Sequence, residues 1–225
     1  MENKNYYNFL IEIEKKILKN FKKHNNLKFS NKKNFQVDPV TKIDLETEKI
    51  IRNEIKKKFP NTSIIGEEYN NEISKSDYVW FIDPIDGTEN FVSGLKEWGV
   101  GVSIYTKGKH VGSLIHLPEL NDFLMTGMKT DKYKSRIIGL SSSLTKSDLI
   151  ELPDDGFEYR IIGCSMYNML SAVRGAYARF ENVKGVIPNV SDAFSTDNRR
   201  RWSQAKNGPI HGSAADMENR LENLA

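Results

Sequence analysis

Apolar residues recur every three or four positions in two stretches of the chain, residues 4–24 and residues 43–59. Charged and polar residues fill most of the intervening positions, so each stretch has an apolar face and a charged face. This spacing is typical of an amphipathic helix. We therefore predict two helices that pack against the rest of the protein, the second of which ends at Pro60.

Short runs of β-branched, aromatic and other apolar residues follow these helices. They predict strands over residues 62–65, 79–82, 98–106, 111–117, 122–127, 137–143, 159–162 and 176–181. The strands between residues 98 and 127 are expected to form an antiparallel meander. Two further helices are expected, one capped by Thr145 and one that begins near Ser165.

The apolar run from Val79 to Ile82 leads directly into two acids, Asp83 and Asp86, and then into Gly87 and Thr88. A buried carboxylate without a partner is too costly to keep ionised, and Mg²⁺ prefers carboxylate and carbonyl oxygens. Gly87 allows a ligand to approach the backbone closely, and Thr88 lies where a helix is expected to begin, a place where phosphate binds readily. The stretch predicts a cation site beside an anion, with a simple tight turn as the alternative.

Composition removes several classes of protein. The chain has 225 residues, of which 38% are hydrophobic and 28% charged, as in an ordinary globular protein. A net charge of +3 is too small to argue for nucleic acid, and we expect neither a nucleic-acid nor a membrane partner. The single cysteine, Cys164, excludes an internal disulfide, and the Lys- and Asn-rich start lacks a hydrophobic signal segment, so we expect a cytoplasmic protein.

Two motifs resemble those of a known family. The longer one reads Trp80-Phe81-Ile82-Asp83-Pro84-Ile85-Asp86-Gly87-Thr88-Glu89-Asn90-Phe91, and the shorter one reads Gly66-Glu67-Glu68. The longer motif is similar to the Trp-x-Ile-Asp-Pro-(Ile/Leu)-Asp-Gly-Thr-x-Asn-Phe signature of the inositol monophosphatase-like, Mg²⁺-dependent phosphatases. The resemblance covers roughly residues 5–185. It implies an α+β fold, the layered α/β/α/β sugar-phosphatase arrangement, with the final α/β layer incomplete.

The resemblance also implies a set of metal ligands. Asp83 would bridge two Mg²⁺ ions, with Mn²⁺ as an alternative metal. Glu67 and the carbonyl of Ile85 would complete one ion, and Asp86 would help to hold the other.

The same family pattern implies catalytic and substrate-binding residues. Asp44 would work with Thr88 to hold the attacking water, and Glu68 would help to order it. A helix N-cap is the other role open to Asp44, and the two roles are compatible. Gly87, Thr88, Ser165 and Glu181 would bind the substrate, although Glu181 could equally be an exposed strand end.

The pattern breaks near residue 186. The family's Trp-Asp metal-ligand pair has no counterpart near Val186, and Asp192 is the nearest acid downstream. Residues 1–185 hold 23 Lys and 19 Ile, whereas residues 186–225 hold 1 Lys and 2 Ile. We therefore expect three regions: residues 1–128 with the metal site, a partial α/β half over residues 129–185, and an aberrant tail over residues 186–225, from a truncated or frameshifted gene.

By resemblance, the function is Mg²⁺-dependent hydrolysis of a small phosphorylated polyol, sugar or related metabolite, by direct attack of water assisted by two or three metal ions. Three alternatives stay open: a catalytically impaired homologue, a histidinol-phosphate phosphatase, and a 3′(2′),5′-bisphosphate nucleotidase. The expected partner is a small phosphorylated metabolite, and a homodimer is left open.

Overall fold

The structure is a computed structural model that describes residues 3–24, 42–150, 152, 156–182 and 185–187. The chain divides into two compact units, Met1–Gly127 and Met128–Ala225. Residues 25–41 and most of the predicted tail, from residue 188 onward, lie outside the described residues. No helix among those described is both long enough and apolar enough to cross a membrane.

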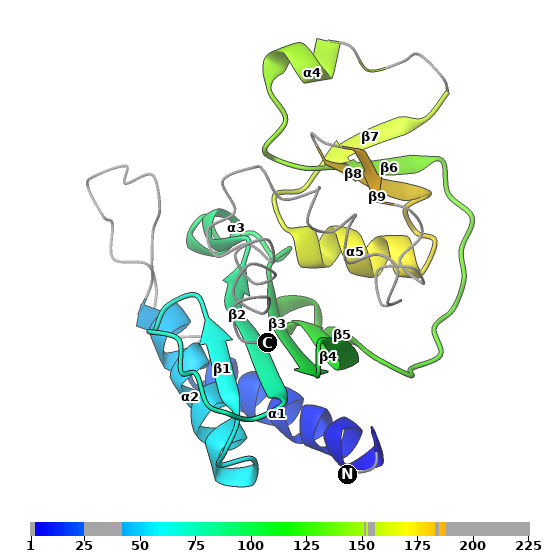
Figure 1. Cartoon of the computed structure of the whole chain (residues 1–225). Coiled ribbons are helices and arrows are strands. Elements are labelled where there is room, and N and C mark those ends of the chain that lie inside the picture. The colour runs from blue at the N-terminus through cyan, green and yellow to red at the C-terminus, as the bar shows by residue number, and fades with distance from the viewer. Residues whose placement is uncertain (1–2, 25–41, 151, 153–155, 183–184, 188–225) are drawn as a thin grey trace. The chain divides into compact units, whose positions relative to one another are not determined.

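The first unit is a five-stranded sheet with helices (Figure 1). Its elements are α1 (Asn3–His24), α2 (Lys42–Lys58), β1 (Ser63–Gly66), β2 (Tyr78–Asp86), α3 (Thr88–Val92), β3 (Gly99–Thr106), β4 (Lys109–Leu117), a short 3₁₀ turn (Pro118–Leu120) and β5 (Asp122–Met125). The strands follow one another in the order β1-β2-β3-β4-β5. β1 and β2 are parallel, and the remaining pairs are antiparallel.

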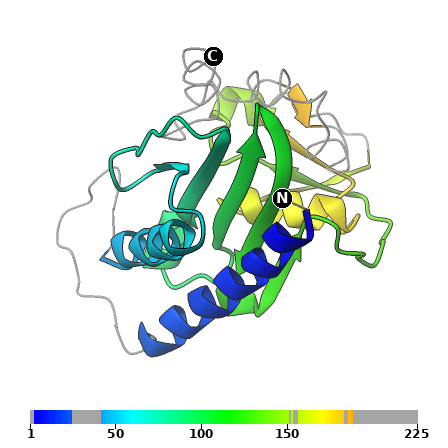
Figure 2. The ribbon, with the colours of Figure 1, turned by 60° about the horizontal axis from the view of Figure 1, so that its bottom comes forward.

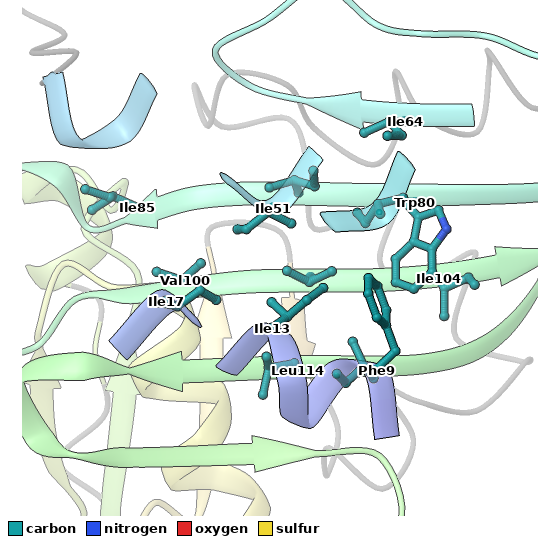
Figure 3. Packing of buried hydrophobic residues seen from close by; sticks show 14 of the residues in the cluster. Phe9, Ile13, Ile17, Ile51, Ile64, Trp80, Ile85, Val100, Ile104 and Leu114 are labelled. Carbon is teal, nitrogen blue, oxygen red and sulfur yellow. The ribbon is translucent and has the colours of Figure 1, made fainter. Parts of the chain in front are cut away.

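The helices α1 and α2 pack against each other and against the sheet, α1 over β4 and α2 over β2 (Figure 2). Their apolar faces meet the sheet in one core, where Phe9 and Ile13 of α1 lie close to the strands (Figure 3). Trp80 of β2 is completely buried there, with its ring edge-on to Phe9 at a centroid distance of 5.4 Å. Burial of each such side chain contributes about 1.5–3 kcal/mol, so this core stabilises the packing of the two helices on the sheet.

The second unit contains a four-stranded sheet. Its elements are β6 (Ile137–Leu140), α4 (Lys146–Ile150), β7 (Glu158–Ile161), α5 (Ser165–Val173), β8 (Arg179–Asn182) and β9 (Gly185–Ile187). The strand order is β7-β6-β8-β9, with β6 parallel to both neighbours and β9 antiparallel to β8. Thr145 caps α4 as predicted, since its Oγ1 accepts a hydrogen bond from the backbone N–H of Asp148 at 3.3 Å.

The α+β fold expected from the sequence is confirmed, and each predicted helix and strand has a counterpart within a few residues. Two boundaries differ for physical reasons. β2 runs on to Asp86, because a bulge opposite β3 accommodates Pro84, which has no N–H to donate. β6 ends at Leu140 rather than at residue 143, because Ser141 begins a turn in which its own Oγ accepts from the N–H of Ser143.

One smaller expectation is corrected. Asp44 is not an N-cap, because α2 already begins at Lys42 and Asp44 lies inside the first helical turn. Val186 and Ile187, the first residues of the predicted tail, belong to β9 and pair with Glu181 and Phe180.

Candidate metal and phosphate site

The parallel pairing of β1 and β2 brings two acidic sequences to one edge of the first sheet. Gly66 of β1 lies opposite Ile82 of β2, so the next residues along the two strands, Glu67 and Asp83, are neighbours. Parallel strands end at the same edge of a sheet, which is why two motifs some fifteen residues apart can form one site. The bulge between Asp83 and Asp86 then carries the second acid past the end of the ladder.

Asp83 lies at this edge among other carboxylates. Its Oδ1 atom is buried and has no hydrogen-bond partner among the residues that the structure describes. Burial raises the pKa of this carboxyl well above its usual range, and repulsion by Asp86, Glu67, Asp44 and Glu48 raises it further. A carboxylate that lacks a partner and is surrounded by like charges is a position at which a bound cation would be strongly stabilised.

The acids do not converge on a single point. Among the described residues, no group of three or more His, Cys, Asp or Glu side chains is arranged so that it could hold a metal ion. The raised pKa of Asp83 is compatible with this absence of a preformed ligand group. Electrostatic repulsion acts over many ångströms, whereas Mg²⁺ coordination needs oxygens at about 2.1 Å from the ion. The residues therefore fit a hard divalent cation in charge and ligand type, while their side-chain positions are those of separate carboxylates.

A tight turn follows the bulge and begins a short helix. Gly87 adopts a left-handed backbone conformation with φ of 83°, which a residue with a Cβ rarely adopts. α3 starts at Thr88, as predicted, and the Thr88 hydroxyl donates to the carbonyl of Ile85 at 3.0 Å. The structure thus joins the predicted ligand carbonyl and the predicted water-holding hydroxyl in one turn.

Asp44 approaches the same site from the helix layer. Its side chain is 1% exposed, and its charge contributes to the raised pKa of Asp83. Asp44 belongs to α2, which packs over β2, the strand that carries the motif. Asp44 is therefore held by the helix–sheet core rather than by a loop.

Two residues that the sequence did not single out also belong to this edge. Glu48 and Arg52 are buried on α2, where Glu48 accepts a hydrogen bond from the Arg52 side chain at 2.6 Å. Glu48 Oε2 also accepts from the backbone N–H of Glu68 at 2.7 Å. The available signal was the presence of two charged residues on the same helical face as Ile51 and Ile55.

The remaining predicted residues lie in the second unit. Ser165 is the first residue of α5, and the preceding Cys164 caps that helix, its Sγ accepting from the N–H of Tyr167 at 3.3 Å. Glu181 lies in β8, with its backbone paired to Leu140. The Glu181 side chain and Asp192 lie outside the described residues.

The family model that matches this chain is that of the inositol monophosphatase family, over residues 3–151. This chain belongs to that family.

Curated relatives match over shorter stretches. A fructose-1,6-bisphosphatase/inositol-1-monophosphatase of Thermotoga maritima is 41% identical over 87 residues, which are 39% of this chain and 33% of the relative. A histidinol-phosphatase of Chlorobaculum parvum is 37% identical over 37% of this chain and 32% of the relative. A Nus factor SuhB of Pasteurella multocida is 39% identical over 43% of this chain and 36% of the relative. The aligned part is thus about a third of the length of each.

Solved structures share the fold of this chain over a larger part of its length than the curated relatives match. The IMPase of Thermotoga maritima has a TM-score of 0.63 at 25% identity and covers 80% of this chain and 78% of that one. An IMPase/NADP phosphatase in complex with Mg²⁺ and phosphate has a TM-score of 0.69 at 19% identity, with 86% and 80% covered. At the lower identity the likeness concerns the fold alone.

Proposed function

We propose that this chain is a phosphomonoesterase that depends on Mg²⁺, or on Mn²⁺ in its place, and that transfers the phosphoryl group directly to water. The observation that carries the proposal is the buried Oδ1 of Asp83, which has no partner and is surrounded by four further carboxylates. Membership of the inositol monophosphatase family supports the reaction type.

The proposal assigns the acids of the strand edge to cation binding. Asp83, Glu67 and Asp86 would hold the metal together with the carbonyl of Ile85, which is buried at the turn. When bound, Mg²⁺ supplies charge stabilisation at phosphorus and activates water near neutral pH. The role of Ile85 is supported by the bulge between Asp83 and Asp86, which leaves Ile85 without a partner in the β2–β3 register.

Three side chains would position the attacking water. Thr88 would orient it by hydrogen bonding, and the buried Asp44 would accept the hydrogen bond that the Thr88 hydroxyl now donates to the Ile85 carbonyl. Glu68 would help to order the same water from the end of β1. The backbone N–H groups of Gly87 and Thr88 would hold the phosphate oxygens.

The substrate class proposed is a small phosphorylated polyol, sugar or related metabolite, with inositol 1-phosphate as the reference compound. The names of the similar proteins, a fructose-1,6-bisphosphatase/inositol-1-monophosphatase and a histidinol-phosphatase, support small phosphate monoesters as a class. Ser165 and Glu181 of the second unit would contact substrate hydroxyls. A homodimer is compatible with this assignment and is not required by it.

The test is hydrolysis by the purified full chain across a Mg²⁺ titration. Inositol 1-phosphate, fructose 1,6-bisphosphate, histidinol phosphate and a 3′-phosphonucleotide would be compared at equal concentration. Phosphate release should require the metal and should disappear in Asp83→Asn. Release that persists in excess chelator, or that is unchanged in Asp83→Asn, would contradict the proposal.

A second candidate is a chain that binds cation and phosphate without turnover. The sequence favours it at one point, since no Trp-Asp pair occurs anywhere in the chain. In that case calorimetry would show Mg²⁺ or Mn²⁺ binding that Asp83→Asn abolishes, with no phosphate released from any of the four esters.

A further inference from the structure

The feature that the proposed function does not use is a pair of opposite charges buried on α2. Glu48 is 0% exposed and Arg52 4% exposed, and the two are one helical turn apart. Burying such a pair is costly unless the remaining hydrogen-bonding groups of both side chains are also satisfied. The stability of the pair therefore depends on the other hydrogen bonds that Glu48 and Arg52 make.

They go to the segment that follows β1. The two carboxylate oxygens of Glu48 accept from consecutive backbone N–H groups, Oε2 from Glu68 at 2.7 Å and Oε1 from Tyr69 at 3.4 Å. Arg52 donates to the carbonyl of Tyr69 at 3.2 Å and to the side chain of Glu72, also at 3.2 Å. Helix side chains thus bind the backbone of the turn on both its donor and its acceptor sides.

Gly66 completes the arrangement from the strand side. A Cβ at this position would overlap the carboxylate of Glu48 and would come within 2.9 Å of Arg52 Nη2. The strand therefore approaches the buried pair more closely than any other residue type allows. Glu67 lies between this close contact at Gly66 and the hydrogen bond at Glu68, so both of its neighbours are fixed by Glu48.

We infer that Glu48 and Arg52 are positioning residues that set Glu67 and Glu68 against Asp83. This inference deepens the proposed function and rests on it for the role of the two acids. We call the hydrogen bonds from Glu48 and Arg52 to the backbone of Glu68 and Tyr69 the clamp, and its existence rests only on those contacts. Neither Glu48 nor Arg52 would touch substrate or metal.

The test substitution is Glu48→Gln in the full chain. Both carboxylate oxygens face N–H donors, whereas a glutamine has one acceptor oxygen and one NH₂ group. Either orientation of the amide places NH₂ against a donor, so the turn must shift although the side chain keeps its size. Glu54→Gln is the matched control, since Glu54 lies on the same helix but pairs with Lys16 instead of with the turn.

Two readouts separate positioning from bulk stability. In metal-free protein, hydrogen exchange at the amides of Glu68 and Tyr69 should accelerate in Glu48→Gln more than exchange in the β3–β4 core. The Mg²⁺ concentration for half-maximal hydrolysis should rise by about 10–100-fold, the range known when a residue supporting a metal ligand is lost. KM for the ester at saturating Mg²⁺ should stay within a few-fold of the parent value, and Glu54→Gln should change neither readout.

Unchanged exchange at Glu68 in a folded Glu48→Gln protein would overturn the inference, and so would an unchanged Mg²⁺ midpoint. If Glu48→Gln does not fold, Arg52→Lys is tested in its place, because a lysine cannot reach Glu48, Tyr69 and Glu72 together. The faster exchange at Glu68 and Tyr69 and the higher Mg²⁺ midpoint are then expected at smaller size. Absence of both changes would overturn the inference. Absence of hydrolysis in the parent chain would overturn the proposed function alone, because exchange and Mn²⁺ calorimetry still decide the clamp.

Discussion

β2 in the first unit and β6 in the second are both largely buried strands that run into polar residues, but the polar atoms are partnered in opposite ways. At the end of β6 the hydroxyls of Ser141 and Ser143 bond each other at 2.7 Å, and the N–H of Ser143 also bonds Ser141 Oγ. At the end of β2 the Oδ1 of Asp83 is buried with no partner. A satisfied polar strand end serves the fold, whereas an unsatisfied one surrounded by like charge calls for a ligand.

The largest effect that this comparison predicts is for Asp83→Asn. In the proposed function, loss of the carboxylate would remove the central metal ligand, and hydrolysis should fall about 10³-fold, since metal charge stabilisation is worth several kcal/mol. Stability should change in the opposite direction. Because the pKa of Asp83 is raised in the folded protein, ionisation costs stability as pH rises above the usual value of 3.8.

Thermal unfolding in chelator should therefore show a higher Tm for Asp83→Asn than for the parent at pH 7, with the difference shrinking as pH falls toward 4. Asp77→Asn is the control, since Asp77 is an exposed carboxylate 3.5 Å from Lys107. A lower Tm for Asp83→Asn in metal-free buffer would show that the carboxylate is a structural partner after all.

The position of Asp83 could be predicted from the sequence, whereas the support of the site could not. The apolar run before Asp83 and the Gly66-Glu67-Glu68 motif after another strand already indicate two acids at strand ends. The burial of Glu48 and Arg52 could not be predicted, because charged residues on a helix are usually solvated. Only the tertiary packing of α2 shows that both side chains face the interior. The path through Pro84 depends on the pairing of β2 with β3, which no local pattern encodes.

A second prediction sharpens the comparison at the turn after β2. If Thr88 and Asp44 act together on the attacking water, Thr88→Ala and Asp44→Asn should each lower kcat about 10²-fold, the usual size of such proton-handling roles. The double variant should lose only a few-fold more, because residues that act as one unit are not additive. Thr145→Ala, at the cap of α4, should leave kcat unchanged. Losses that multiply in the double variant would assign separate roles to the two residues.

His116 is a second buried group whose pKa is shifted by its surroundings. Its Nδ1 is buried without a hydrogen bond, and burial lowers the pKa of the ring to about 4 against a partly opposing effect of Asp122. Glu14 Oε1 lies 3.5 Å from Nδ1, yet a ring with this pKa is neutral at pH 7, so the contact is no ion pair there. The histidine should therefore affect stability rather than ligand binding.

The sign of that effect follows from proton uptake. Between pH 6.5 and 4 the unfolded chain binds a proton that the folded chain does not, so stability falls as pH falls through this window, by about 3 kcal/mol in all. Denaturant unfolding at pH 7 and pH 5 should show a smaller loss for His116→Gln than for the parent, and the two should bind Mg²⁺ alike at pH 7. Equal losses in both proteins would show that the ring already carries its proton in the fold.

The smallest expected effect is for Ser141→Ala at the end of β6. The hydroxyl is largely buried and bonds Ser143, so its loss should cost about 1 kcal/mol, or about 2–4 °C in Tm. Exposed Ser142→Ala should cost less, and neither variant should shift the Mg²⁺ midpoint. A shifted Mg²⁺ midpoint in Ser141→Ala would mean that the end of β6 affects cation binding although the hydroxyls of Ser141 and Ser143 bond each other. The presence or absence of hydrogen-bond partners would then not distinguish the end of β2 from the end of β6.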